Sequence, residues 1–119
     1  MKNIIGIIGL GPRGVSLLER LLTNIIRNNL SKDIKFLLFD KNKAKGFGCH
    51  NPAISDNLLV NTISDQITMY FGKEMENFGL INEGPSFYQW SVEKNKNVKK
   101  NEYLPRVQLS KYLEYFYTE

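Results

Sequence analysis

Three glycines near the start of the chain have a spacing that suits one kind of chemistry. Gly9, Gly11 and Gly14 form the pattern GxGxxG directly after an apolar run. At such a turn the first glycine allows a sharp change of direction, the second lets a pyrophosphate approach the backbone, and the third lets a helix pack closely on a strand. Pro12 suits the first helical position, where its missing N–H costs no hydrogen bond. The spacing predicts a binding site for the pyrophosphate of a dinucleotide.

Asp40 is the second candidate for this site, because it ends an apolar run over residues 34–39. It lies a little beyond the usual distance of about 20 residues from the glycine pattern. A carboxylate there can accept hydrogen bonds from the adenosine ribose and would repel a 2′-phosphate, which favours FAD or NAD over NADP. Lys41 and Lys43 weaken this preference, since a lysine can offset the repulsion. The alternative is that Asp40 only caps the following turn.

The elements around these residues predict a right-handed βαβ unit. Residues 3–8 are rich in isoleucine and apolar on both faces, as in a strand in the middle of a parallel sheet. Residues 12–28 have apolar side chains at helical spacing, and residues 34–39 form the next strand. We expect an α/β fold with a Rossmann-like dinucleotide-binding core and additional helices.

The rest of the chain has weaker patterns. Ser86 and Gln89 have the spacing of a capping box before a helix. The other expected elements are a loop with glycines at 46 and 48, a strand-like run at 58–60, a short helix from Ser64 that carries residues 67–70, a loop with one helical turn at 72–84, a polar loop at 93–101, and a last helix from about Pro105.

Length and composition limit the functional classes. With 119 residues, the chain is too short for two nucleotide-binding domains plus a substrate domain, so we expect one partial domain over residues 1–119. The net charge of +4 is mild, and the lysine-rich stretch 94–100 has no interleaved aromatic or arginine, as in a solvated loop. The single cysteine and the short, glycine-interrupted N-terminal apolar run favour a cytoplasmic protein that binds neither nucleic acid nor membrane.

Two groups of residues allow either a structural or a functional interpretation. Cys49 and His50 are adjacent but have no further His or Cys, so we interpret them as loop residues and predict no metal site. Trp90 and the aromatic residues at 112–117 could stack on a flavin or adenine, but at helical spacing they more often form a core or an interface.

Several segments occur in the same order as in a known family. They are GLGPRG at 9–14, LLFD at 37–40, GFG at 46–48, NLLVNTISDQ at 57–66, FYQW at 87–90 and YLPRVQLSKYL at 103–113. With them the chain resembles the N-terminal FAD/NAD(P)-binding domain of a bacterial flavoprotein family. That family is similar to flavin-dependent hydroxylases of the urate hydroxylase type and, more distantly, to amine N-hydroxylating monooxygenases. Cys49 and His50 depart from the family's usual small or aromatic residues.

The resemblance implies a site for FAD, with NAD(P)H as a second dinucleotide. Asn61 and Gln66 would then line the pocket toward the flavin, and Arg106 would lie near the cofactor or anchor the final helix. The candidate cofactor-binding residues are Gly9, Gly11, Pro12, Arg13, Gly14, Asp40, Gly48, Asn61, Gln66 and Arg106.

Three functions follow from these patterns. The first is the FAD-binding portion of an NAD(P)H-dependent flavoprotein oxidoreductase, a monooxygenase or hydroxylase. The second is a single-site module for NAD or another adenine nucleotide. The third is a non-catalytic interaction fragment that docks a partner through its last helix. No general base or nucleophile can be assigned, and an unpaired sheet edge predicts self-association or pairing with a complementary C-terminal half.

Overall fold

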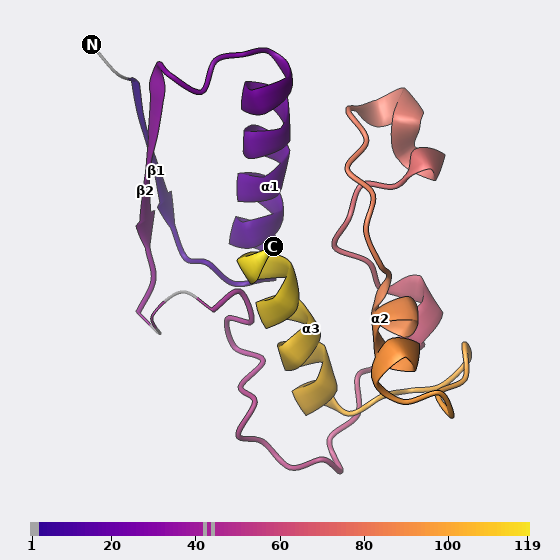
Figure 1. Ribbon diagram of the computed structural model, residues 1–119. Helices are drawn as coiled ribbons and strands as arrows, with labels where there is room; N and C mark the ends of the chain where they lie inside the picture. The colour runs from indigo at the N-terminus through magenta and orange to yellow at the C-terminus, as the bar shows by residue number, and fades with distance from the viewer. Residues whose placement is uncertain (1–2, 42, 44) are drawn as a thin grey trace.

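The computed structural model describes residues 3–41, 43 and 45–119 and shows a small α/β fold. Two parallel strands, β1 (Asn3–Ile8) and β2 (Ile34–Phe39), pair in register, with Asn3 opposite Ile34 and Ile8 opposite Phe39. The helix α1 (Pro12–Arg27) connects them and lies along one face of the pair (Figure 1). The predicted βαβ unit and its three elements are confirmed.

The sheet buries one face only. Ile7 turns toward α1 and packs in a core cluster with Val15 and Leu18. The alternate residues of β1 face outward, and Ile8 is 88% exposed. The expected central strand, covered on both faces, is therefore not found within the described residues, because they place no element on this outer face.

The second half of the chain forms a helical layer beside α1 (Figure 1). Its elements are the short 3-10 helices η1 (Ser64–Gln66) and η2 (Lys73–Phe78) and the α-helices α2 (Phe87–Lys94) and α3 (Arg106–Thr118). The capping box that begins α2 is confirmed: Ser86 Oγ accepts from Gln89 N at 3.2 Å, and Gln89 Oε1 accepts from Ser86 N at 2.8 Å.

Two clusters of buried side chains meet at α3. Phe87, Trp90 and Tyr112 belong to the cluster between α2 and α3, whereas Phe116, one turn after Tyr112, belongs to the cluster between β1 and α1. Tyr112 is fully buried, and its hydroxyl donates to Pro85 O at 2.8 Å. These aromatic side chains are core residues, as the structural interpretation of the sequence predicted. The helix α3 thus joins the helical layer to the βαβ unit.

Three weaker predictions need correction. Residues 58–60 form no strand; Leu59 makes a single antiparallel bridge with Pro105. The short helix from Ser64 ends at Gln66, because Ile67 is already extended, and Ser64 Oγ donates to the backbone of Lys99 and Lys100 instead of capping the helix. The loop at 72–84 holds the six residues of η2, more than the one turn expected.

Candidate functional site

The glycine turn joins β1 to α1 and fixes their spacing. Gly9 N donates to Phe39 O at 2.7 Å, which extends the parallel pairing of the strands into the turn. A Cβ atom at Gly14 would lie 2.0 Å from Gly9 O, far inside van der Waals contact. Only glycine can therefore occupy position 14 while α1 packs this closely on the turn.

The N-terminus of α1 is electrostatically suited to an anion. The first intrahelical bond runs from Val15 N to Gly11 O at 3.0 Å, with Pro12 at the first helical positions. Within the described residues, no side chain caps this terminus and no acidic residue lies in its first turn. The partial positive charge of the helix end is thus not offset by a neighbouring carboxylate of the same turn, which is the arrangement that favours a bound phosphate.

Asp40 lies against the glycine turn. Its Oδ2 accepts a hydrogen bond from Leu10 N at 2.7 Å, and Leu10 is 1% exposed. The carboxylate therefore satisfies a backbone N–H that would otherwise be buried without a partner. The sequence had suggested contact with a ribose or a cap on the following turn. The structure adds a third role, the positioning of the turn itself.

A loop from the middle of the chain closes the site. We define residues 45–50 as the cavity loop. Its Gly48 approaches the glycine turn so closely that a Cβ at Gly11 would lie 3.3 Å from Gly48 Cα. Between the loop and the strand ends lies a cavity of about 710 Å³, a size typical of ligand sites. Its lining residues are Ile8, Gly9, Gly11, Leu38, Phe39, Asp40, Lys41, Gly48 and Cys49.

The structure brings together some of the predicted residues. Gly9, Gly11, Asp40 and Gly48 line this one cavity at the carboxyl ends of β1 and β2, where open α/β sheets bind ligands. Pro12 lies just behind it: a Cβ at Gly48 would lie 3.4 Å from Pro12 Cδ. The predicted site residues did not include Leu10 or Cys49, although each is adjacent to one of them. Lys41, which the sequence offered as an offset to the charge of Asp40, also lines the cavity.

The other predicted residues lie elsewhere. Arg13 lines a separate surface depression with Ser16 and Arg20, and Asn61 is exposed. Arg106 Nε donates to Leu59 O at 3.1 Å, so the arginine anchors the start of α3, the second of its two expected roles. Contact of these side chains with a cofactor stays a prediction.

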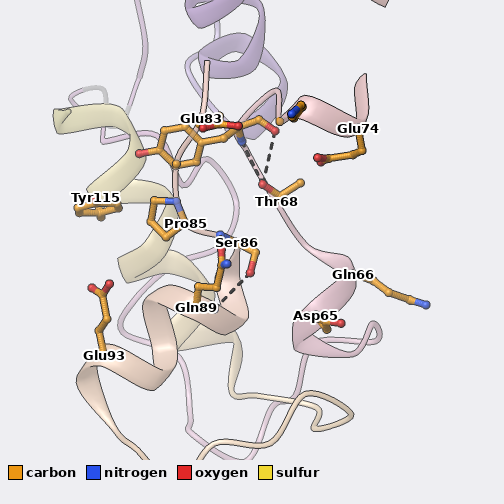
Figure 2. A pocket seen from close by; sticks show the side chains of 14 residues that line it. Asp65, Gln66, Thr68, Glu74, Glu83, Pro85, Ser86, Gln89, Glu93 and Tyr115 are labelled. Carbon is orange, nitrogen blue, oxygen red and sulfur yellow. Dashed lines mark hydrogen bonds between the residues drawn. The ribbon is translucent and has the colours of Figure 1, made fainter. Parts of the chain in front are cut away.

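Gln66 lines a second cavity of about 910 Å³, whose lining includes no residue of the glycine turn. Figure 2 shows Asp65 and Gln66 on one side of this cavity and Glu93 and Tyr115 on the other. Four carboxylates line it, with a single lysine: Asp65, Glu74, Glu83, Glu93 and Lys73. This surplus of negative charge disfavours a pyrophosphate. The anion of a dinucleotide therefore fits the first cavity better.

Two groups near these cavities have shifted pKa values. Burial, and then the charge of Arg106, hold the pKa of His50 below its ordinary value, so the imidazole in the cavity loop is neutral at neutral pH. Burial, with Tyr115 nearby, raises the pKa of Tyr70 far above its ordinary value, so this phenol beside the second cavity stays protonated. Neither group carries a charge that would alter the electrostatics of its cavity.

The described part of the chain has neither a metal site nor a membrane-spanning helix. No three His, Cys, Asp or Glu side chains there are grouped so that they could hold a metal ion. Within the same residues, no helix has the length and apolar character needed to cross a membrane.

A βαβ unit whose glycine turn, acidic residue and glycine loop share one cavity defines a dinucleotide-binding protein of the Rossmann type. Comparison with known families agrees: residues 6–119 match the FAD-NAD(P)-binding family, and the chain belongs to it. Nitrosuccinic acid synthase npaA of Aspergillus oryzae is 33% identical over 118 residues, which is 97% of this chain and 18% of the relative.

Two further relatives are described as L-aspartate N-monooxygenase (nitrosuccinate-forming). The protein of Streptomyces cremeus is 26% identical over 87 residues, 73% of this chain and 13% of the relative. The protein of Streptomyces davaonensis is 28% identical over 90 residues, 76% of this chain and 14% of the relative. The chain spans less than a fifth of the length of each of these relatives.

Proposed function

We propose that this chain is the FAD-binding N-terminal portion of an NAD(P)H-dependent flavoprotein monooxygenase. The observation that supports it best is the cavity in which Gly9, Gly11, Asp40 and Gly48 meet at the ends of β1 and β2. The chain also belongs to a FAD-NAD(P)-binding family and is similar to N-monooxygenases, which favours this function over other dinucleotide-binding functions.

The residues present fit the ADP part of FAD. The glycine turn and the uncapped start of α1 would receive the pyrophosphate, with Pro12, Arg13 and Gly14 in that first turn. Asp40 would accept from the ribose hydroxyls while it holds Leu10 N. Its charge favours FAD or NAD over NADP, although Lys41 also lines the cavity and offsets part of that preference.

When bound, FAD would supply the hydride and oxygen chemistry. The chain's own residues would bind and orient the dinucleotide. Among the described residues that line the first cavity, Asp40 is the one carboxylate, and it is hydrogen-bonded to the turn. We therefore assign it to binding and propose no general base.

We further propose that the complete protein oxidises the nitrogen of an amino acid. This rests on the names of the relatives, two of which are L-aspartate N-monooxygenases. Because the chain spans 18% or less of their lengths, such an activity would need residues beyond these 119. L-Aspartate-dependent oxidation of NADPH by the complete protein, with formation of an N-oxidised product, would test it.

The cofactor is tested by titrating the chain with FAD while flavin fluorescence is followed, with NADH and NADPH as competitors. We expect saturable binding of FAD that NADH does not displace. Gly11→Val should abolish it, because the new side chain would fill the gap toward Gly48, whereas Leu17→Val on the exposed side of α1 should not. Selective binding of NADH would favour the single-site nucleotide module, and a folded chain that binds no nucleotide would favour the interaction fragment.

A further inference from the structure

We propose that α3 positions the cavity loop against the glycine turn, with Ser110 as the main positioning residue, and so sets the affinity of the dinucleotide site. The inference rests on the proposed function of that site. It concerns a contact between two segments that are distant in sequence, residues 45–50 and α3; Ser110 and His50 are 60 residues apart.

A buried hydroxyl holds the end of the cavity loop. Ser110 is fully buried, and its Oγ donates to His50 O at 2.5 Å. The same hydroxyl lies 3.0 Å from Arg106 O of its own helix. A serine hydroxyl has one proton to donate, and the backbone oxygen of His50 is its nearer acceptor. Removal of the Ser110 hydroxyl would therefore break the hydrogen bond to the cavity loop.

The start of the cavity loop packs directly on α3. Gly46 has φ +80°, and a Cβ there would lie 2.7 Å from both Leu113 O and Tyr117 Cβ. The loop backbone therefore touches the helix backbone with no side chain between them. Lys45 Nζ and Glu114 Oε1 add an exposed ion pair at 3.4 Å. The loop is thus held on α3 at both of its ends.

The middle of the loop touches the nucleotide site. A Cβ at Gly48 would lie 2.9 Å from Gly11 Cα, so the loop is enclosed between α3 and the glycine turn. Gly48 and Cys49 both line the first cavity. A loop released from α3 would move these two residues relative to the turn, and the width of the cavity would no longer be fixed. Binding of the dinucleotide would then have to order the loop, and this ordering would weaken the affinity.

The test compares two buried serines. Ser110→Ala removes the hydroxyl that holds the loop, and Ser91→Ala removes an equally buried hydroxyl of α2 that, within the described residues, has no hydrogen-bond partner. We would measure FAD affinity, thermal stability and the rate at which Cys49, the only cysteine and exposed, reacts with an aromatic disulfide. We expect Ser110→Ala to weaken FAD binding about 2- to 12-fold, the scale of one hydrogen bond.

Ser110→Ala should also change the Cys49 reaction rate, whereas Ser91→Ala should leave both affinity and rate at the parent values. Equal affinities and equal thiol rates in the two variants would overturn the proposal. The thiol rate needs no cofactor. If the parent binds no FAD, the proposed function fails, yet a changed rate in Ser110→Ala alone would still support the positioning role.

The exposed ion pair of Lys45 and Glu114 provides a second test that does not depend on whether Ser110→Ala folds. Lys45→Glu places two carboxylates side by side and should raise the thiol rate, and the further change Glu114→Lys should restore it. Both side chains are about half exposed, so neither change disturbs a core. Failure of the second change to restore the rate would count against α3 as the element that positions the loop.

Discussion

Replacement of Asp40 would separate its observed contact with the glycine turn from its proposed contact with a ribose. Asp40→Ala removes the acceptor for Leu10 N and the proposed acceptor for the ribose. Asp40→Asn keeps an oxygen that can accept from Leu10 N but removes the negative charge. Since Asp40 Oδ2 lies 2.7 Å from Leu10 N, and Leu10 is 1% exposed, the alanine variant leaves a buried N–H without a partner.

The magnitudes follow from hydrogen-bond energetics. A buried unsatisfied donor costs about 1 to 3 kcal/mol, so Asp40→Ala should lower the free energy of unfolding by that amount. Loss of the ribose contact should cost a similar free energy of binding, which is a roughly 5- to 140-fold weaker affinity for FAD. Asp40→Asn should keep most of the stability while its affinity for NADPH relative to NADH rises, because the charge that repels a 2′-phosphate is gone.

The assay combines urea unfolding, followed by tryptophan fluorescence of Trp90, with titrations of FAD, NADH and NADPH. Trp90 is 6% exposed and lies in the helical layer, so its emission reports global unfolding. If Asp40→Ala unfolds at the parent's urea concentration and binds FAD with the parent's affinity, Asp40 neither holds the turn nor contacts the cofactor. If stability falls and affinity does not, the turn role stands and the ribose role is refuted.

Three other predictions concern stability and association. Tyr112→Phe should cost about 1 to 3 kcal/mol in urea unfolding, because the buried hydroxyl pairs with two backbone groups, whereas Tyr103→Phe at an exposed position should cost nothing measurable. The pKa of His50 is lower in the folded chain, so the unfolded chain binds a proton at this imidazole more readily. The stability of the fold should therefore fall as the pH drops below 6.5. Thermal melts from pH 8 to 5 should show that His50→Gln removes this part of the pH dependence. Ile8 and Phe39 are 88% and 54% exposed on the outer sheet face. If this apolar face mediates self-association, the double variant Ile8→Ser/Phe39→Ser should self-associate less than the parent in sedimentation velocity. An unchanged distribution of sedimentation coefficients would exclude that face as the contact.

The sequence predicted the βαβ unit well because three independent signals agreed there. The apolar runs predicted the two strands, and the glycine pattern and the helical spacing predicted the helix between them. The structure has strands at Asn3–Ile8 and Ile34–Phe39 and a helix at Pro12–Arg27, one residue shorter than predicted. The capping box before α2 succeeded for a similar reason, since it specifies two reciprocal hydrogen bonds. Local chemistry determined these elements.

The run at 58–60 shows where local chemistry is insufficient. Leu58, Leu59 and Val60 favour an extended conformation, and the chain there is extended enough to pair: Val60 N donates to Leu104 O at 2.9 Å, and Arg106 N donates to Leu58 O at 2.8 Å. The ladder stops after this one bridge because its partner becomes α3 at Arg106. A strand needs a partner that stays extended, and no pattern within 58–60 reports what the partner does.

The cavity proposed to bind the dinucleotide also depends on residues that are distant in sequence. Its inner wall follows from the glycine pattern, because the turn and the start of α1 are one continuous segment. Its outer wall, at Gly48 and Cys49, depends on a loop whose neighbours are Ser110 and Leu113 of α3. Phe116 of that helix packs in the core beneath the glycine turn, so α3 fixes both the loop and the floor of the βαβ unit. The width of the cavity is therefore a property of the tertiary fold. A substitution far along the chain in α3 should alter binding at the proposed pyrophosphate site even though the glycine pattern itself is unchanged.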